Sequence, residues 1–377
     1  MMALQIFVIV IVTLYSFALL MLLHAFRRSS VATTKRKASS RKSIAVVIAV
    51  RNEAENIERL LESISNQQCE FPFEIIVSDD ESTDDTLARA KAFKERSSVD
   101  VRIISSSGAG KKQALTSAVA ITDAEIIIVT DGDCVVPESW IQAHAIRYQN
   151  EQVQFVAGMV TYKKQSTLLR AVLETELIFL QVASGALFHL GSPAMCNGAS
   201  MSFRRSFFQS IGGFQSDTRV SGDDLSLLYR AGQRGNGSVE WIFDRDAVVA
   251  TESAATLAGA IAQRKRWLSK MSQFASFSSL FSGVLFLLAQ LLLPSAVLAY
   301  ACSSTLANHL LLAVGIKSVV ELLFLSLAVP FFGEERIIRI FPAAVVLYNF
   351  ISISAVIALI KRNVNWKGRT WKMGRMQ

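Results

Sequence analysis

The sequence predicts an α/β domain with a mostly parallel sheet, placed between an N-terminal transmembrane helix and a C-terminal group of transmembrane helices. Two observations predict this arrangement. Through the middle of the 377-residue chain, apolar strand-like runs alternate with amphipathic helical patterns, which is typical of βαβ units. The N-terminal stretch and about the last hundred residues are by contrast strongly apolar.

The N-terminal apolar stretch, Ala3–Leu23, carries no charge and is long enough to cross a bilayer, which takes about 20 residues. A cleaved signal peptide would instead begin with basic residues and have a shorter apolar core. Here the basic residues follow the apolar run, in a linker rich in Ser, Lys and Thr. We therefore expect a retained anchor over residues 1–26, a basic linker over 27–43, and the next domain on the cytoplasmic side.

The formal net charge of +8 fits this topology and contact with anionic lipids. No basic stripe interleaved with aromatic residues is visible, so we expect membrane lipids as partners and no nucleic acid. The four cysteines are widely spaced without a Cys-x-x-Cys pair, which indicates free thiols in a reducing compartment. The expected location is a cell membrane (plasma or inner), crossed several times by the chain.

The elements of the central domain can be assigned in order. Ile44–Val50 is a continuous apolar run, which suits a strand buried on both faces of a parallel sheet. A helical pattern starts at Asn52-Glu53 and keeps its apolar residues on one face. The elements that follow are strand Phe73–Val77, helix Thr86–Lys94, strand Val101–Ser105, helix Lys112–Ile121 and strand Glu125–Thr130.

Acidic residues follow two of these strands, and ligands of such folds bind at the carboxyl ends of the strands. Asp79 and Asp80 follow one strand, and Asp131-Gly132-Asp133 follows another. Mg²⁺ or Mn²⁺ takes one or two carboxylate oxygens and completes its shell with substrate phosphates. An isolated Asp-Gly-Asp is also an ordinary turn. The second acidic pair at the same sheet edge favours a metal site.

We expect the domain to span residues 44–274, and beyond Asn150 its pattern becomes mixed. Thr167–Leu190 reads as a largely apolar helix that packs on the core or lies at the membrane. Gly222-Asp223-Asp224 precedes a helix over Leu225–Ala231, and a helix over Ala255–Phe274 carries Gln263-Arg264-Lys265-Arg266-Trp267.

The C-terminal part, residues 275–362, contains three apolar segments of spanning length, Phe277–Ala301, His309–Phe332 and Phe341–Ile360. Three spans would place the basic tail, residues 363–377, outside the cell, against the positive-inside tendency.

We therefore favour an even number of spans and a cytoplasmic tail. One segment would then be interfacial or re-entrant, or breaks near Pro294 and Lys317 would make four short spans. Lys317 and Glu321 are four residues apart, and we expect them to neutralise each other.

Several motifs occur in a fixed order along the chain. They are Ala49-Val50-Arg51-Asn52-Glu53, Asp79-Asp80-x-Ser82-x-Asp84, Gly110-Lys111, Asp131-Gly132-Asp133, Gly198, Gly213-Phe214, Gly222-Asp223-Asp224 and Gln263-x-x-Arg266-Trp267. Together they resemble membrane-bound family 2 glycosyltransferases, over about Ile44 to Trp267. The resemblance implies a Rossmann-like GT-A sheet. The relatives it is similar to include ceramide-glucosyltransferase-like enzymes and processive polysaccharide synthases.

The resemblance also implies an activity, the inverting transfer of a sugar from a nucleoside-diphosphate sugar, usually a UDP-sugar. Asp131 and Asp133 would act through Mg²⁺ or Mn²⁺ on the diphosphate. Asp79 or Asp80 would meet the uridine, and Lys111 would hold phosphate. The donor-binding residues implied by the resemblance also include Ala49, Val50, Arg51, Glu53, Gln263, Arg266 and Trp267.

By the same resemblance, Asp223 or the adjacent Asp224 would be the general base for the acceptor hydroxyl. The family usually has Glu-Asp here, whereas this chain has Gly222-Asp223, which leaves the identity of the base open. Helix capping is the alternative role of Asp224. For the segment that ends at Trp267, the alternatives are an aromatic platform for the acceptor and a basic helix lying at the membrane.

Three other functions fit the sequence less well. A phosphate-loop ATPase would need Gly and Ser or Thr where Ser105 and Lys112 stand. A membrane receptor or scaffold would not need acidic pairs at several strand ends. A processive synthase needs a helix-lined pore, yet only about 110 residues follow Trp267. We therefore favour one sugar transferred to a lipid or lipid-linked acceptor, in glycolipid or cell-envelope polysaccharide biosynthesis.

Overall fold

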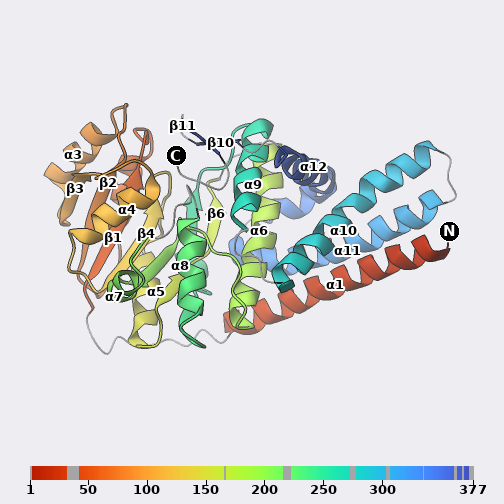
Figure 1. Cartoon of the computed structure of the whole chain (residues 1–377), viewed down its shortest axis with the longest axis horizontal. Helices are drawn as coiled ribbons and strands as arrows, with labels where there is room; N and C mark the ends of the chain where they lie inside the picture. The colour runs from red at the N-terminus through yellow and green to blue at the C-terminus, as the bar shows by residue number, and fades with distance from the viewer. Residues whose placement is uncertain are drawn as a thin grey trace. The chain divides into compact units, whose positions relative to one another are not determined.

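The computed structural model divides the chain into two compact units (Figure 1). It describes residues 2–31, 42–164, 167–214, 222–271, 277–302, 306–333, 335–360, 363–366 and 369–372. The α/β unit consists of Ser29–Lys163, Phe188–Glu252 and Asn363–Gln377. The helical unit consists of Met1–Arg28, Lys164–Leu187 and Ser253–Arg362.

A seven-stranded sheet in the order β3-β2-β1-β4-β7-β5-β8 forms the centre of the α/β unit. Its strands are β1 (Ile44–Val50), β2 (Phe73–Asp79), β3 (Val101–Ser105), β4 (Ile126–Asp131), β5 (Phe155–Ala157), β7 (Met201–Arg204) and β8 (Val239–Trp241). The first four are parallel, which confirms the predicted mostly parallel sheet. β7 is antiparallel to both β4 and β5. Strands β6 (Val160–Tyr162) and β9 (Val249–Thr251) form a small parallel pair.

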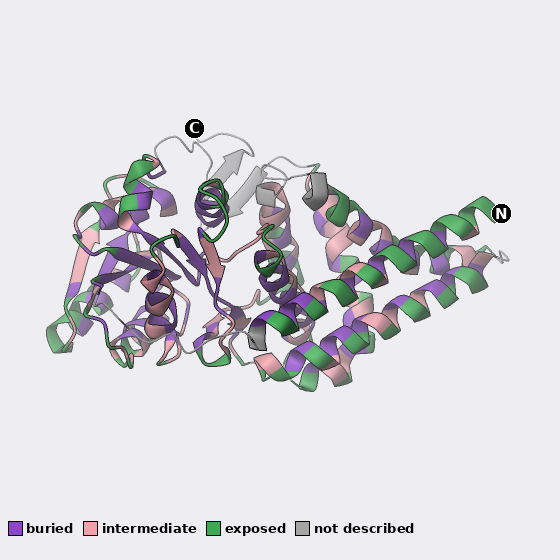
Figure 2. Ribbon diagram, turned by 90° about the horizontal axis from the view of Figure 1, so that it is seen from below, coloured by how far each residue is buried: buried purple, intermediate pink, exposed green. Residues whose placement is uncertain are grey.

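Helices cover this sheet because each has an apolar face. α2 (Ile57–Ser65) buries Ile57, Leu60, Leu61 and Ile64, the four positions that the helical pattern predicts. These side chains join those of β1 and β2 in one core, which Figure 2 shows as the buried interior of the strands. The other helices of this unit are α3 (Thr86–Arg96), α4 (Lys111–Ala120), α5 (Trp140–Ala145), α7 (Arg205–Ser210) and α8 (Asp223–Gly232).

The helical unit contains several long helices, most of them apolar. They are α1 (Met2–Val31), α6 (Leu168–His189), α9 (Leu257–Met271), α10 (Phe277–Ala301), α11 (Leu306–Phe332) and α12 (Arg336–Ala358). By length and composition, five of the helices in the described part of the chain could cross a membrane, all of these except α9. The apolar part of α6 is 72% buried inside the protein, against 22% for α10, so α6 packs as a core helix of this unit.

The proposed breaks near Pro294 and Lys317 are wrong. Pro294 lies inside α10 and Lys317 inside α11, and both helices continue through these residues. An apolar helix tolerates proline where neighbouring groups satisfy the freed carbonyl. Lys317 is tolerated because its Nζ lies 2.8 Å from Glu321 Oε1 one turn further on, as predicted. Tyr15 Oη on α1 donates to the same oxygen at 2.6 Å.

The unit boundaries also differ from the predicted domain, residues 44–274. Helices α6 and α9 cluster with the apolar helices, because their apolar faces pack there. The predicted tail, residues 363–377, contains an antiparallel hairpin of β10 (Asn363–Trp366) and β11 (Arg369–Lys372). Most of the predicted linker lies outside the described residues, and α1 continues to Val31.

Candidate active site

The carboxyl ends of β1, β2 and β4 meet at one edge of the sheet. Ala49 lies opposite Asp131, and Val50 lies opposite Asp79. The N–H of Asp80 donates to the carbonyl of Val50 at 2.8 Å, so the chain after β2 stays against the end of β1. The structure therefore brings these predicted residues together, as expected from the parallel order of the strands.

The loop after β2 is held in shape by charged and polar groups. Arg51 Nη1 donates to the carbonyls of Asp80, at 2.5 Å, and Glu81, at 3.1 Å. Asp80 Oδ1 accepts from the N–H of Gly110 at 2.8 Å. Asp79 Oδ2 accepts from the N–H of Ser82 at 3.3 Å, whereas Asp79 Oδ1 is buried without a hydrogen-bond partner among the described residues. One buried acceptor thus remains available at this edge.

Gly132 separates Asp131 from Asp133 at a point where no side chain fits. A Cβ there would lie 2.8 Å from Cγ of Glu53. Glu53 is fixed in turn, because its N–H donates to Thr86 Oγ1 at 2.7 Å and its Oε2 accepts from Asn56 at 3.0 Å. Glu53 therefore lies against the acidic turn and supports its shape.

The two carboxylates of this turn differ in their partners. Asp131 Oδ1 lies 2.6 Å from Nζ of Lys111. Asp133 Oδ1 accepts from Thr251 Oγ1 at 3.2 Å. Burial raises the pKa of the neighbouring Cys134 thiol well above its usual value, and the negative charges of Asp133 and then Asp131 raise it further. Cys134 is therefore a neutral thiol beside two carboxylates.

Lys111 lies among three carboxylates at the start of α4. Its Nζ is 2.6 Å from Asp131 Oδ1 and 3.3 Å from Asp223 Oδ2. Burial acts to lower the pKa of this ammonium, but the attraction of Asp131, Asp223 and then Asp224 outweighs it, and the pKa lies above its usual value. Lys111 is therefore a permanent cation between the acidic turn and the start of α8.

Asp223 and Asp224 begin α8 after Gly222, whose φ of +96° is a conformation that glycine adopts without strain. Both carboxylates are buried. Asp224 Oδ1 accepts from the N–H of Leu225 at 2.9 Å, so this carboxylate is engaged with the first turn of the helix. Asp223 points one oxygen toward Lys111 instead.

The loop before β7 reaches the same edge because β7 is antiparallel to β4. Met201, at the beginning of β7, pairs with Val129 near the carboxyl end of β4. A Cβ on Gly198, in the loop just before, would lie 3.0 Å from Lys111 Nζ and 3.3 Å from Asp223 Oδ2. The loop thus forms one side of the charged cluster. The sequence pattern singled out Gly198 without indicating this position.

The predicted residues Gln263, Arg266 and Trp267 lie on α9, in the helical unit. Their place at the donor site stays a prediction. Gln263 Oε1 accepts from Arg264 Nη1 at 2.6 Å, and the Arg264 guanidinium lies 4.9 Å from the centre of the Trp267 ring.

Arg264 is a residue that sequence reasoning missed. It donates to Glu176 Oε2 on α6 from Nε at 2.7 Å and from Nη2 at 2.5 Å, and both side chains are almost fully buried. The only signal was a carboxylate inside an apolar helix, which has to find a cation. This ion pair fixes the helix that carries Gln263 and Trp267.

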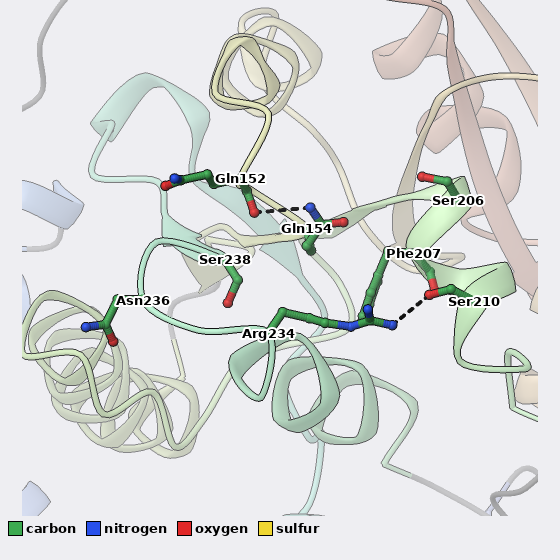
Figure 3. Close-up of a pocket in the computed structure, with 8 residues that line it drawn as sticks. All are labelled: Gln152, Gln154, Ser206, Phe207, Ser210, Arg234, Asn236 and Ser238. Carbon is green, nitrogen blue, oxygen red and sulfur yellow. Dashed lines mark hydrogen bonds between the residues drawn. The ribbon is translucent and has the colours of Figure 1, made fainter.

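A polar hollow of about 480 Å³ lies elsewhere in the α/β unit, and none of the predicted site residues lines it (Figure 3). Arg234 donates to Ser210 Oγ at 2.9 Å across it, and Gln154 donates to the carbonyl of Gln152 at 3.1 Å. We assign this hollow no role.

The sheet and its covering helices have the GT-A fold seen in solved glycosyltransferase structures. Residues 45–212 match the family model described as glycosyl transferase family 2. In solved structures, the mannosyltransferase PcManGT from Pyrobaculum calidifontis, in complex with GDP-Man and Mn²⁺, superposes with a TM-score of 0.63. It is 19% identical, and the match covers 95% of this chain and 99% of that one, a likeness that shows the fold.

Two curated relatives are similar over shorter stretches. A beta-monoglucosyldiacylglycerol synthase from Nostoc sp. is 28% identical over 234 residues, 59% of this chain and 48% of the relative. The probable glycosyltransferase YdaM from Bacillus subtilis is 27% identical over 199 residues, 50% of this chain and 46% of the relative. The chain thus spans about half the length of the curated relatives it matches.

Proposed function

We propose that the protein is a membrane-associated, inverting glycosyltransferase that moves one sugar from a UDP-sugar to a hydroxyl of a lipid or lipid-linked acceptor. The observation that carries this proposal is the position of Lys111. Its ammonium joins Asp131 of the acidic turn to Asp223 at the start of α8. Asp131 would serve the leaving diphosphate, and Asp223 would take the proton of the acceptor. A cation between these two carboxylates suits a single displacement.

The nucleotide end of the donor would lie at the ends of β1 and β2. Asp79 Oδ1, buried and without a partner among the described residues, suits the N–H of a uracil ring. The backbone of Ala49 and Val50 lies beside it in register and would face the base. Arg51 supports this loop through the Asp80 carbonyl, and Lys111 would turn its ammonium to the diphosphate.

Asp131 and Asp133 fit a divalent cation by the chemistry of their oxygens, and Asp131 Oδ1 already attracts a cationic group at 2.6 Å. Among the described residues there is no group of three or more His, Cys, Asp or Glu that could hold a metal ion. This agrees with an ion that takes the rest of its shell from the donor diphosphate. When bound, Mg²⁺ or Mn²⁺ would neutralise charge that develops on the leaving diphosphate.

Asp223 is the stronger candidate for the general base, because Asp224 already accepts a hydrogen bond from the backbone of α8. The acceptor oxygen would form a bond to the anomeric carbon while the bond from that carbon to the diphosphate oxygen breaks. The acceptor proton would pass to Asp223, and the electron pair would leave with the diphosphate. Attack from the opposite face inverts the anomeric configuration.

A lipid acceptor is supported by the apolar helices and by the relative whose name describes synthesis of a glucosyldiacylglycerol. The site would face the cytoplasm, where nucleotide sugars are supplied. Gln263, Arg266 and Trp267 would contribute from the helical unit to donor or acceptor binding. A processive synthase is the alternative, and a long polymer product would support it.

The test uses the full chain in lipid nanodiscs with Mn²⁺ and a panel of UDP-glucose, UDP-galactose, UDP-N-acetylglucosamine and GDP-mannose. Native lipid extract and diacylglycerol serve as acceptors, and released nucleoside diphosphate is measured. Asp133→Asn and Asp223→Asn should each lower the rate by about 10²-fold or more. Asp100→Asn, at an exposed carboxylate before β3, should keep the wild-type rate.

Two outcomes would contradict parts of the proposal. Full metal-dependent activity of Asp133→Asn would remove the metal assignment. A retained anomeric configuration in the product, determined by NMR, would exclude single displacement. Wild-type protein that is inactive with every donor and acceptor of the panel would count against the transfer reaction itself.

A further inference from the structure

A fully buried polar network lies behind the loop that forms one side of the charged cluster. It consists of Trp140, His144, Tyr148, Ser200 and Ser202, and we call it the serine–histidine network. Trp140 Nε1 donates to Ser200 Oγ at 3.0 Å, and His144 Nε2 lies 3.2 Å from the same oxygen. On the other side of the ring, His144 Nδ1 lies 2.8 Å from Ser202 Oγ, which lies 2.9 Å from the Tyr148 hydroxyl.

One of these hydrogen bonds has a fixed direction. An indole N–H can only donate, so the Ser200 oxygen accepts from Trp140. Burial and then the charge of Arg147 lower the pKa of His144 to about 3, so the ring is neutral at working pH. A neutral imidazole donates through one ring nitrogen and accepts through the other, so His144 can bond Ser200 and Ser202 at the same time.

The backbone also fixes Ser200 in place. Its carbonyl accepts from the N–H of Gly158 at 2.8 Å. A Cβ on Gly158 would lie 2.2 Å from Ser200 Oγ, so the serine hydroxyl occupies the space that a side chain there would need. Ser200 is thus held both through its hydroxyl and through its main chain.

Ser200 ends the turn that carries Gly198. The N–H of Ser200 donates to the carbonyl of Asn197 at 3.1 Å, and the N–H of Ala199 donates to Asn197 Oδ1 at 3.0 Å. Gly198, inside this turn, lies against Lys111 Nζ and Asp223 Oδ2. A shift of Ser200 would therefore also shift Gly198 relative to Lys111 and Asp223. These are the residues assigned to the leaving diphosphate and to the acceptor proton.

We propose that Ser200 is a positioning residue for transfer: its hydrogen bonds to Trp140 and His144 set the 197–200 turn, and the turn sets the distance between Lys111 and Asp223. This inference rests on the proposed function. Displacements of about 1 Å at reacting groups are enough to cost a large part of a rate. Ser202 provides the matched comparison, because it bonds the same histidine and is equally buried but lies within β7 beyond the turn.

The experiment compares Ser200→Ala with Ser202→Ala in the full chain in nanodiscs, using whichever donor of the panel is active. Each variant leaves one His144 nitrogen without its serine partner, and we expect both to lower the Tm by a similar few degrees. We expect Ser200→Ala alone to lower kcat, about tenfold, and to change the KM for the donor less than kcat, because the Asp79 end of the site is untouched. Ser202→Ala should keep kcat within about twofold.

Equal kcat for the two variants would overturn the proposal, since the serines would then be purely structural. A raised donor KM with unchanged kcat in Ser200→Ala would also overturn it. Gly158→Ala is a second route to the same turn, because its new methyl displaces the Ser200 hydroxyl, and it should lower kcat in the same way. Inactive wild type would count against the proposed function, whereas active wild type with a fully active Ser200→Ala would count only against the role of Ser200.

Discussion

The α/β unit and the helical unit each contain a lysine–carboxylate pair, and the two pairs differ in how far their side chains are exposed to solvent. In the helical unit, Lys317 and Glu321 lie one turn apart on α11 with side chains only 4% and 7% exposed. In the α/β unit, Lys111 and Asp131 come from different elements, and their side chains are 20% and 36% exposed. Glu321 also accepts from Tyr15, while Lys111 also contacts Asp223.

The comparison teaches how the same pairing serves two purposes. The Lys317–Glu321 pair is closed from water and completed by a neighbouring helix, so it neutralises charges that the apolar surroundings could not otherwise hold. The Lys111–Asp131 pair remains accessible, so water or a ligand can replace either partner. A closed pair should matter to stability, and an open pair should matter to activity.

The largest effect is expected from Lys317→Leu, which leaves the Glu321 carboxylate buried without its cation. Breaking a buried ion pair costs about 3–5 kcal/mol, so the helical unit should unfold at a clearly lower temperature in a thermal-shift measurement in nanodiscs. The double variant Lys317→Leu with Glu321→Leu should recover most of the loss, because no charge remains buried. If the single variant is as stable as wild type, the distinction between closed and open pairs is lost.

Lys111→Met is the corresponding change at the open pair. We expect kcat/KM for the donor to fall about 10²-fold, or about 2.7 kcal/mol, because a preorganised cation for the diphosphate is lost. The unfolding temperature should fall less than in Lys317→Leu, since water can reach Asp131. Lys91, an exposed lysine on α3, supplies the control Lys91→Met, which should be neutral in both measurements. A Lys111→Met variant whose unfolding temperature falls as far as that of Lys317→Leu, while its kcat/KM stays at the wild-type value, would reverse the comparison.

The smallest effect is expected from His144, a buried group that stays uncharged, unlike the two ion pairs. An unfolded histidine binds a proton below about pH 6.5, whereas folded His144 has a pKa of about 3. Between these values the unfolded chain binds more protons, so stability falls as the pH falls. The loss should be roughly 2 kcal/mol at pH 5 relative to pH 7.5. His144→Gln should lose this part of the pH dependence in denaturation curves, and an unchanged slope would contradict the assignment.

The sequence predicted the parallel strands well because they are buried on both faces. β1 and β4 are uninterrupted apolar runs, and each ends where its polar residues begin. The short strands β5, β6, β8 and β9 have three residues each and too little pattern to recognise. β7 is antiparallel, and nothing in its four residues indicates a direction.

The site was predictable where it follows strand ends and unpredictable where distant segments meet. Asp79 and Asp131 could be placed at one edge because parallel strands share that edge. The approach of Lys111 to Asp223 depends on how α4 and α8 pack, and local spacing holds no information on it. The same holds for Arg264 and Glu176, which are 88 residues apart. Gln263 and Trp267 are expected with the donor-binding residues, and this stays a prediction because their helix belongs to the other unit.

The interleaving of the two units along the chain has a consequence for biosynthesis. Val8 and Val12 of α1 form a core cluster with Leu292, Ala296, Leu310 and Ala313 of α10 and α11. At about 5–20 residues per second, the ribosome needs roughly 15–55 seconds to make the chain between α1 and these partners. During that interval Tyr15 has no Glu321 to bond. Helix α1 therefore meets these packing partners only after α10 and α11 have been made.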